Sequence, residues 1–209
     1  MEPTTAAGVR RVDLPDGRSL VVRPVAPGDV DGLAALYEGM SDEDRYRRFF
    51  SGFQPDRDFL ERAVAVRERG GYGLVAVESA AGGAAVPRIV GEASYELLPN
   101  GDGEMAMAVA GDWRGWLGPY LLDALIAAAA ARGVPNLEAD VLATNSPMLS
   151  LLRARGYATL QHDDWVSLRL MVGTAGHTPV WPRRAGRGSG PAGPRVLVEA
   201  PGGRWHAGR

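Results

Sequence analysis

The stretch Asp112-Trp113-Arg114-Gly115-Trp116-Leu117-Gly118-Pro119 is followed by an apolar run from Tyr120 to Ala131, and these two segments decide the fold. A strand-like segment ends before the stretch, a turn with two glycines follows, and a helix begins. Such a helix start presents backbone N–H groups without partners, and the helix dipole adds partial positive charge, so a phosphate can bind there. Pro119 suits the first helical position, because it fixes φ and lacks an N–H that would be unpaired anyway. The alternative is a plain strand-to-helix connection.

The composition excludes several kinds of site. The 209 residues include no Cys, which rules out disulfides, Cys-ligated metal and a thiol acyl-enzyme. The three His residues are scattered without metal-ligand spacing, so no metal is expected. The net charge is −2, and the main domain is not an obvious nucleic-acid binder. All 23 basic residues are Arg, so the chain cannot modify lysine side chains of its own.

The sequence shows no targeting or membrane segment. Residues Met1 to Val9 lack the charged start and apolar stretch of a signal peptide. The apolar run from Tyr120 to Ala131 is too short for a bilayer, which needs about 20 residues. We therefore expect a cytoplasmic protein without a membrane partner.

The first part of the chain predicts a hairpin and then three short helices. Val9 to Val25 is typical of two strands around the turn Pro15-Asp16-Gly17. Helices are expected to open at Pro27-Gly28-Asp29 and to span Asp42 to Phe50, with Ser41 as N-cap, and Pro55 to Arg69. Three helices in a row before any long sheet indicate a helical lid.

Three arginines on the second expected helix allow two interpretations. Arg45, Arg47 and Arg48 could form a basic patch, or they could make up a solvated helix face. We favour the solvated face, because charged side chains usually stay exposed.

The middle of the chain predicts a sheet that changes from antiparallel to parallel. Strands are expected at Gly73 to Glu78, Ile89 to Leu98 and Glu104 to Ala110, separated by the loop Ala80 to Pro87 and a turn at residues 99–103. The last of these connections is too short for a crossover, so the strands should be antiparallel. Gly133 and Pro135 should end the helix that follows. The strand Leu137 to Leu142 is then reached through a helix, so it should be parallel to the strand before it.

The final elements of the main domain are a helix and a hairpin. Ser146-Pro147 starts a helix from Met148 to Arg155, and Gly156 ends it. Strands around Tyr157 to Gln161 and Trp165 to Val172 then form a closing hairpin. His162-Asp163-Asp164 resembles a metal or acid/base cluster, but we assign it to the hairpin turn.

Beyond Gly173 the composition shifts to Gly, Pro and Arg, which cannot bury a core. We therefore divide the chain into a domain at residues 1–173 and a flexible tail at residues 174–209. The tail reads as a linker rather than a nucleic-acid arm. Arg195 to Glu199 could form a strand, and the tail could be the start of a further domain that this chain lacks.

The order of these elements, with Asn145 and Gly156-Tyr157 eleven residues later, resembles the GNAT family of acetyl-CoA-dependent N-acetyltransferases over roughly residues 18–172. The segments Val22-Arg23-Pro24-Val25 and Ser41 to Phe50 (SDEDRYRRFF) resemble more narrowly the branch that includes bacterial protein lysine acetyltransferases. The resemblance implies a mixed α/β fold with a central mixed sheet of six to seven strands and helices on both faces.

The resemblance also implies a place for the CoA moiety. In the family the turn Arg/Gln-x-x-Gly-x-Gly/Ala binds the pyrophosphate through backbone N–H groups, and pantetheine pairs with the preceding strand where two parallel strands splay apart. Here the turn departs from that pattern: aligned on Gly118 it is one residue short, and aligned on Gly115 it carries Asp112 and Leu117 at the outer positions. The cofactor-binding residues implied are Met107, Ala108, Val109, Arg114, Gly115, Trp116, Leu117, Gly118, Pro119, Tyr120, Asn145 and Met148. Asn145 either bonds pantetheine or caps its helix.

The chemistry implied by the resemblance needs a general base. An alkylamine of pKa about 10 is almost wholly protonated at neutral pH, so a carboxylate must remove a proton before the amine can attack. Glu104 stands at the strand start where family members carry a catalytic Glu, and Glu92 and Glu96 are backup candidates on a strand face that is expected to meet solvent. A backbone N–H near Val109 should polarise the thioester carbonyl. Many members protonate the departing thiolate with a Tyr seven residues after the Asn, where this chain has Leu152.

The expected function is therefore direct transfer of acetyl from acetyl-CoA to an amine, either a protein lysine or a small molecule. The alternative is a non-catalytic acyl-CoA-binding or regulatory module, which the shortened turn and Leu152 favour. The acceptor, the acyl chain length and the oligomeric state, a homodimer included, stay open.

Overall fold

The computed structural model describes residues 9–14, 18–79, 87–161, 166–177, 195–200 and 204–207. The turn Pro15-Asp16-Gly17, most of the loop Ala80 to Pro87 and the cluster His162-Asp163-Asp164 lie outside these residues. The helices are η1 (Pro27–Asp29), α1 (Val30–Glu38), α2 (Asp42–Phe49), α3 (Arg57–Val64), η2 (Val66–Arg69), η3 (Gly111–Trp113), α4 (Leu117–Ala131) and α5 (Ser146–Arg153). The strands are β1 (Arg10–Asp13), β2 (Ser19–Pro24), β3 (Tyr72–Ser79), β4 (Arg88–Leu97), β5 (Gly103–Val109), β6 (Asn136–Leu142), β7 (Ala158–Gln161), β8 (Ser167–Gly173), β9 (Arg195–Ala200) and β10 (Arg204–Ala207).

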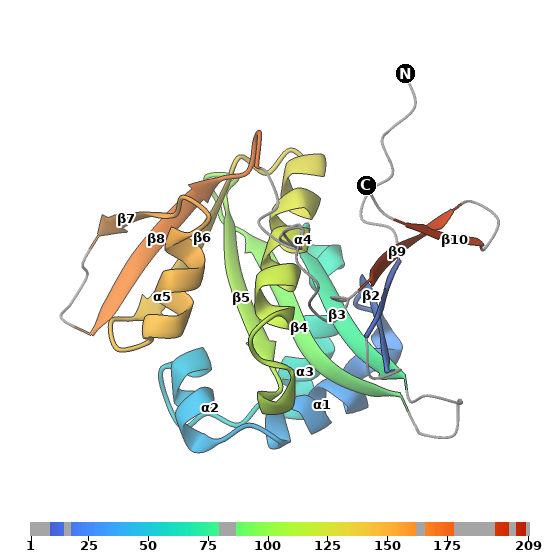
Figure 1. Ribbon diagram of the computed structural model, residues 1–209. Helices are drawn as coiled ribbons and strands as arrows, with labels where there is room; N and C mark the ends of the chain where they lie inside the picture. Colours follow the sequence, from blue (N-terminus) through green and yellow to red (C-terminus); the bar gives the residue numbers. More distant parts are fainter. Residues whose placement is uncertain are drawn as a thin grey trace, which may run out of the picture.

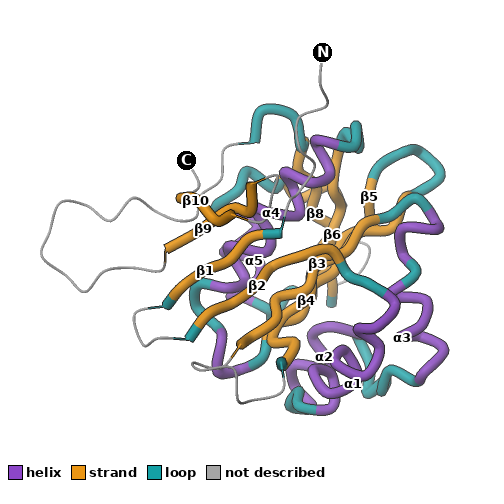
Figure 2. Tube along the Cα trace, turned by 90° about the vertical axis from the view of Figure 1, so that its right-hand side faces the viewer, coloured by secondary structure: helices purple, strands orange, loops and turns teal. Residues whose placement is uncertain are grey.

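One sheet runs through the described residues in the order β10-β9-β1-β2-β3-β4-β5-β6-β8-β7 (Figure 2). Its neighbouring strands are antiparallel except for β5 and β6, which are parallel as the crossover through α4 predicts. The mixed α/β fold class is confirmed. Within the described residues the sheet has ten strands instead of six to seven: β1 to β8 already make eight, and β9 and β10 extend the sheet beyond β1. The strand expected at Arg195 to Glu199 is therefore present as β9.

The two parallel strands separate soon after they begin. The ladder between β5 and β6 contains only the pairs Gly103–Leu137 and Glu104–Glu138, whereas β5 pairs with β4 along its whole length. Figure 1 shows β5 and β6 diverging, with α5 beside β6 and α2 below the opening. One edge of Met105 to Val109 is consequently unpaired with any described strand.

Helices cover both faces of the sheet, as expected (Figure 1). One core lies where the apolar residues of α4 and α5 meet the sheet, and its fully buried side chains include Trp113, Leu117, Leu121, Leu125 and Leu152. A second core lies on the opposite face, where α1, α3 and η2 contribute Leu33, Leu36, Leu60, Val64 and Val66. The site is built between these two helical layers.

Local sequence signals account for most element ends. Ser41 caps α2, because its Oγ accepts a hydrogen bond from the backbone N–H of Asp44 at 3.2 Å. Gly133, at φ +75°, follows the last turn of α4. One prediction is wrong: α4 begins at Leu117, so Pro119 is its third residue. The third position also lacks an intrahelical N–H partner, so proline is tolerated there.

The prediction of a solvated arginine face on α2 is also wrong. Arg45 is 9% exposed, and the side chain of Arg48 is only 17% exposed. Residues three apart lie on the same side of a helix, and this side of α2 faces the protein. Arg47 is only 31% exposed in its side chain and pairs with both Glu43 and Asp44.

Among the described residues, none of the helices combines the length and the apolar composition that crossing a bilayer requires.

Candidate active site

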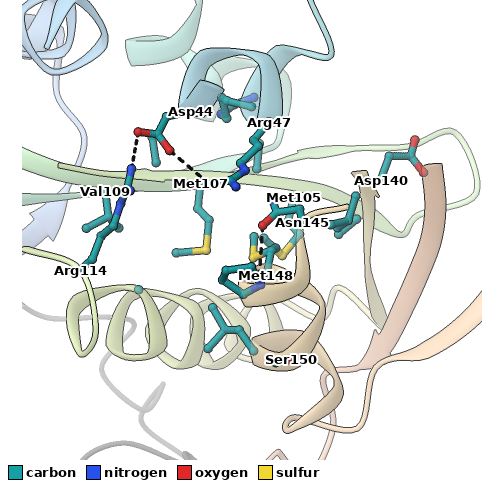
Figure 3. A pocket seen from close by; sticks show the side chains of 18 of the residues that line it. Asp44, Arg47, Met105, Met107, Val109, Arg114, Asp140, Asn145, Met148 and Ser150 are labelled. Carbon is teal, nitrogen blue, oxygen red and sulfur yellow. Dashed lines mark hydrogen bonds and ion pairs between the residues drawn. The ribbon is translucent and has the colours of Figure 1, made fainter. Parts of the chain in front are cut away.

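A cavity of about 1050 Å³ fills the opening between β5 and β6 (Figure 3). Its walls come from α2, β5, the glycine turn with the start of α4, β6 and α5. Segments from distant parts of the chain therefore enclose one space. Of the residues predicted to bind the cofactor, the cavity is lined by Met107, Ala108, Val109, Arg114, Gly115, Gly118, Pro119, Asn145 and Met148.

The glycine turn opens the N-terminus of α4 toward this cavity. Gly115 has φ +101°, a conformation that side-chain-bearing residues rarely adopt, so glycine is required for this geometry. The Trp116 ring packs instead against the rings of Trp113 and Tyr120, at centroid distances of 5.9 and 6.4 Å. Leu117 and Tyr120 are buried in the core. The side chains of Trp116, Leu117 and Tyr120 therefore do not line the cavity, whereas their neighbours do.

Arg114 links this turn to α2. Its Nη2 lies 2.5 Å from Oδ2 of Asp44 (Figure 3). The same Oδ2 accepts a hydrogen bond from the Ser41 hydroxyl at 2.6 Å. Burial favours the protonated form of Asp44, but the hydrogen bonds from Ser41 and Arg114 outweigh it and lower the pKa of this carboxyl. Asp44 is therefore ionised at neutral pH, and it neutralises the arginine nearest the helix start.

Glu104 lies at the point where the sheet begins to open. Its side chain is exposed, and it pairs in register with Glu96 on one side and Glu138 on the other. It lines the large cavity and also a second cavity of about 250 Å³ beneath α1 and α3. Met105 and Ala106 are likewise shared by the two cavities. The start of β5 is thus the junction between the two spaces.

Glu92 is buried, contrary to the solvent-facing position expected for it. Its Oε1 accepts hydrogen bonds from the Tyr37 hydroxyl at 2.9 Å and from Arg48 Nη2 at 3.4 Å, and its Oε2 accepts one from Ser94 at 3.4 Å. Burial first, and then the charge of Glu92, raises the pKa of Tyr37 well above its ordinary value. Glu92 lines only the smaller of the two cavities. Glu96, at the strand end, pairs with Arg69.

The helix α5 closes the side of the large cavity opposite α2. Asn145 caps it, because its Oδ1 accepts a hydrogen bond from the Met148 N–H at 3.3 Å. Leu152 is fully buried in the core, so no side chain at that position reaches the cavity. The capping role of Asn145 is therefore present, and the residue also lines the cavity.

A buried ion pair fixes α5 against α4. Arg155 donates to both carboxylate oxygens of Asp123, at 2.7 and 3.0 Å, and to the Pro119 carbonyl at 3.0 Å. His177 Nε2 lies 3.1 Å from Oδ1 of the same Asp123. The arginine thereby holds the first turn of α4, which borders the cavity. In the part of the chain that is described, no group of His, Asp and Glu side chains is arranged to hold a metal ion.

Three residues near the site were not singled out as site residues from the sequence: Asp44, Arg48 and Arg155. Asp44 and Arg48 belong to the quoted segment SDEDRYRRFF, and Arg155 lies directly before Gly156. The three-residue spacing of Arg45 and Arg48 was the available signal, because it places both on one helix face. Nothing in the local sequence indicates the partners of Arg155.

Comparison with known proteins places this geometry in a family. A family model described as Acetyltransferase (GNAT) domain matches residues 19–158. Acetyltransferase Pat of Mycolicibacterium smegmatis is 32% identical over 154 residues, which are 73% of this chain and 45% of that protein. The chain thus spans less than half the length of this curated relative.

Solved structures share the fold. The GNAT domain of S. lividans PAT aligns with a TM-score of 0.69 and 25% identity, over 81% of this chain and 99% of that chain. An acetyltransferase of Salmonella typhimurium, solved with its cofactor acetyl-CoA, aligns with a TM-score of 0.58 and 17% identity, over 76% of this chain and 96% of that chain. The second likeness concerns the fold alone.

Proposed function

The chain belongs to the acetyltransferase (GNAT) domain family, and from this premise we propose that it transfers acetyl from acetyl-CoA directly to an amine. The observation that carries the proposal is the cavity between β5 and β6, which joins a helix N-terminus at one end to the Glu104 carboxylate at the other. Donors for a pyrophosphate and an acceptor for a proton thus lie on one continuous wall.

We orient acetyl-CoA along this wall with its pyrophosphate at the glycine turn and its thioester toward Glu104. The backbone N–H groups of the turn and of the first residues of α4, with the Arg114 side chain, would bind the pyrophosphate. Pantetheine would pair with the free edge of β5 along Met107 to Val109, where β6 has moved away. Asn145 and Met148 of α5 would border it from the other side. The thioester then falls near the start of β5, and not beside the backbone N–H near Val109 that the family resemblance implied for its carbonyl.

Glu104 is the base in this proposal. It is exposed, reaches both cavities and lies at the junction where the thioester falls. It would take the proton that an ammonium acceptor must lose, since the amine attacks only in its neutral form. Glu92 is already bound by Tyr37, Ser94 and Arg48, so it supports the site rather than acting as the base.

The acceptor proposed is a lysine side chain of another protein. The 32% identity to Acetyltransferase Pat supports this choice, together with the resemblance of SDEDRYRRFF to the branch of protein lysine acetyltransferases. The carboxylates of Glu104 and Glu138, which lie opposite each other in the register of β5 and β6, would attract a cationic side chain.

Two measurements test the proposal. Calorimetric titration with acetyl-CoA measures binding, and release of the CoA thiol in the presence of lysine peptides, polyamines and small amines measures transfer. Because the chain contains no lysine, acetylation of its own side chains adds no background. Binding and peptide-dependent thiol release are expected. Binding without release on any amine would favour a non-catalytic acyl-CoA-binding module, and absence of binding would reject both.

A further inference from the structure

Arg48 of α2 lies where the two cavities meet. It lines both of them, together with Phe49, Glu104, Met105 and Ala106. If the proposed function holds, the reacting thioester falls at this junction. A cationic side chain and the proposed base therefore flank the same small region.

The guanidinium of Arg48 is held by neighbouring side chains, and 17% of the side chain stays exposed where it lines the two cavities. Its Nη2 donates to Glu92 at 3.4 Å, and its central carbon lies 4.8 Å from the centre of the Phe49 ring. Glu92 is itself fixed by the Tyr37 hydroxyl. The Nε of Arg48 is fully buried and, among the described residues, has no hydrogen-bond partner. A buried donor without an acceptor is unfavourable, so the guanidinium gains from one further acceptor, and a ligand oxygen can approach it through the exposed part of the side chain.

The side chain is also charged. Burial disfavours the cation, but the neighbouring Tyr37 and Glu92 outweigh burial and raise the pKa of Arg48 above its ordinary value. A fixed cation in a region of low water content stabilises developing negative charge more strongly than water does.

We propose that the Arg48 guanidinium binds the carbonyl oxygen of the acyl group and stabilises the oxyanion of the tetrahedral intermediate. The neutral amine attacks the thioester carbon, a C–N bond forms, and the carbonyl π electrons move to the oxygen beside Arg48. Glu104, which is exposed and has passed the proton of the ammonium to water, then takes the N–H proton of the intermediate. The oxygen electrons then re-form the carbonyl, the C–S bond breaks, and CoA leaves as the thiolate. Arg48 is thus a catalytic residue on α2, the helix that otherwise encloses the cavity.

The competing explanation is that Arg48 only neutralises the buried Glu92. The two explanations differ in the double variant Arg48→Met/Glu92→Gln, which has no buried carboxylate left to neutralise. If Arg48 binds the oxyanion, the double variant stays as slow as Arg48→Met. If Arg48 only neutralises Glu92, the kcat of the double variant returns toward the wild-type value.

The experiment compares Arg48→Met, Glu92→Gln, the double variant and the control Arg57→Met, an exposed arginine of α3 that lines neither cavity. We expect kcat to fall by about 100- to 1000-fold in Arg48→Met and in the double variant. The Kd for CoA, which lacks the acyl carbonyl, should stay within about threefold of the wild-type value in both, and this also shows that both variants fold. The kcat of Glu92→Gln should fall less than that of Arg48→Met, and the kcat of Arg57→Met should equal the wild-type value.

Three outcomes overturn the inference. These are recovery of kcat in the double variant, a kcat of Arg48→Met close to wild type, and a parallel loss of CoA affinity and kcat. Lack of amine-dependent thiol release in the wild type would instead reject the proposed function, and this inference with it. If the wild type releases thiol and Arg48→Met does so at a similar kcat, only the role of Arg48 is rejected and the proposed function stands.

Discussion

Arg114 of the glycine turn and Asp44 of α2 form an ion pair across the mouth of the large cavity, with Nη2 and Oδ2 2.5 Å apart. The arginine nearest the helix start is therefore occupied by a carboxylate of the protein itself. A pyrophosphate at the turn would have to share this guanidinium with Asp44 or displace the carboxylate. Binding at the turn is thereby coupled to α2, the helix that also carries Arg48.

Asp44→Asn should strengthen acetyl-CoA binding. Removing the carboxylate frees Arg114 and also removes a negative charge near the phosphates. The arginine is half exposed, so we expect a gain of roughly 1.4-fold to fivefold in affinity, which corresponds to the 0.2–1 kcal/mol range of exposed ion pairs. Calorimetry at low and high salt measures it, and Asp58→Asn in α3 is the control. If Asp44→Asn bound acetyl-CoA more weakly than the wild type, the Arg114–Asp44 ion pair would instead be needed to keep the binding site accessible.

The length of the glycine turn can be tested in two directions. Inserting one glycine between Trp116 and Leu117 restores the spacing of the family turn, and we expect acetyl-CoA to bind more tightly because one more backbone N–H is available. Gly115→Ala should weaken binding, because a side chain at φ +101° is strained although its Cβ would meet no atom within 4 Å. Thermal shift and calorimetry check both. Equal affinity in all three proteins would mean that the turn does not bind the cofactor.

Glu104→Gln should lower kcat/KM most near neutral pH. A general base contributes about 100- to 10000-fold where the amine is protonated, and the loss should shrink toward about pH 10, where free amine is abundant. The measurement is a pH profile of thiol release with a lysine peptide. Glu38→Gln, at the exposed end of α1, serves as the control. A pH-independent loss would remove Glu104 from the role of base.

Asp123→Leu should destabilise the fold strongly. Asp123 and Arg155 are 4% and 2% exposed in their side chains, and losing the carboxylate leaves a buried guanidinium without its counter-ion. We expect the free energy of unfolding to fall by about 3–5 kcal/mol, whereas Asp123→Leu/Arg155→Met should recover most of it. Urea unfolding monitored by tryptophan fluorescence gives both values. A double variant less stable than Asp123→Leu would contradict this account.

Asp29 should make stability depend on acid pH. Its carboxylate accepts two hydrogen bonds from Arg23, at 2.7 and 2.6 Å, and one from the Ala26 N–H at 2.8 Å. Burial favours the protonated form, but the bonds from Arg23 and Ala26 outweigh it and lower the pKa of Asp29. The stabilisation is therefore complete above the unfolded-state pKa and is lost as the pH falls through the folded-state pKa.

Asp29→Asn should thus lower the free energy of unfolding by about 1.5–3 kcal/mol at neutral pH, the range for hydrogen bonds to charged groups. The difference from the wild type should narrow as the pH falls below about 4. Urea unfolding at a series of pH values measures this. A difference that stays constant with pH would show that the ionised carboxylate is not responsible.

Much of the fold could be predicted because its signals are local. The N-cap at Ser41 and the stop at Gly133 depend on a few neighbouring residues. The parallel pairing of β5 and β6 follows from the helical crossover between them. The family resemblance is confirmed by the match of the GNAT domain model. The partner of β9 could not be predicted, since strand pairing across most of the chain leaves no local trace.

The candidate site was only partly predictable for the same reason. Alternation correctly places Glu92, Ser94 and Glu96 on one face of β4, but it cannot tell which part of that face a helix covers. Glu92 lies under α1 and meets Tyr37, whereas Glu96 stays exposed at the strand end. The burial of Arg48 depends on the same covering layer. The local sequence indicated the glycine turn and the family resemblance pointed to Glu104, whereas only tertiary packing brings Arg48 to the cavity that both of them line.

The pairing of β1 with β9 has a consequence for synthesis on the ribosome. Arg11 lies opposite Leu197, so the outer edge of β1 finds its partner only after the intervening residues 12–196 have been translated. Until then that edge offers free N–H and C=O groups to any other nascent strand. Such long-range pairs also form slowly, because a large loop must close first. The strand β9, made late, thus protects the edge of β1, one of the first strands to be made, against aggregation.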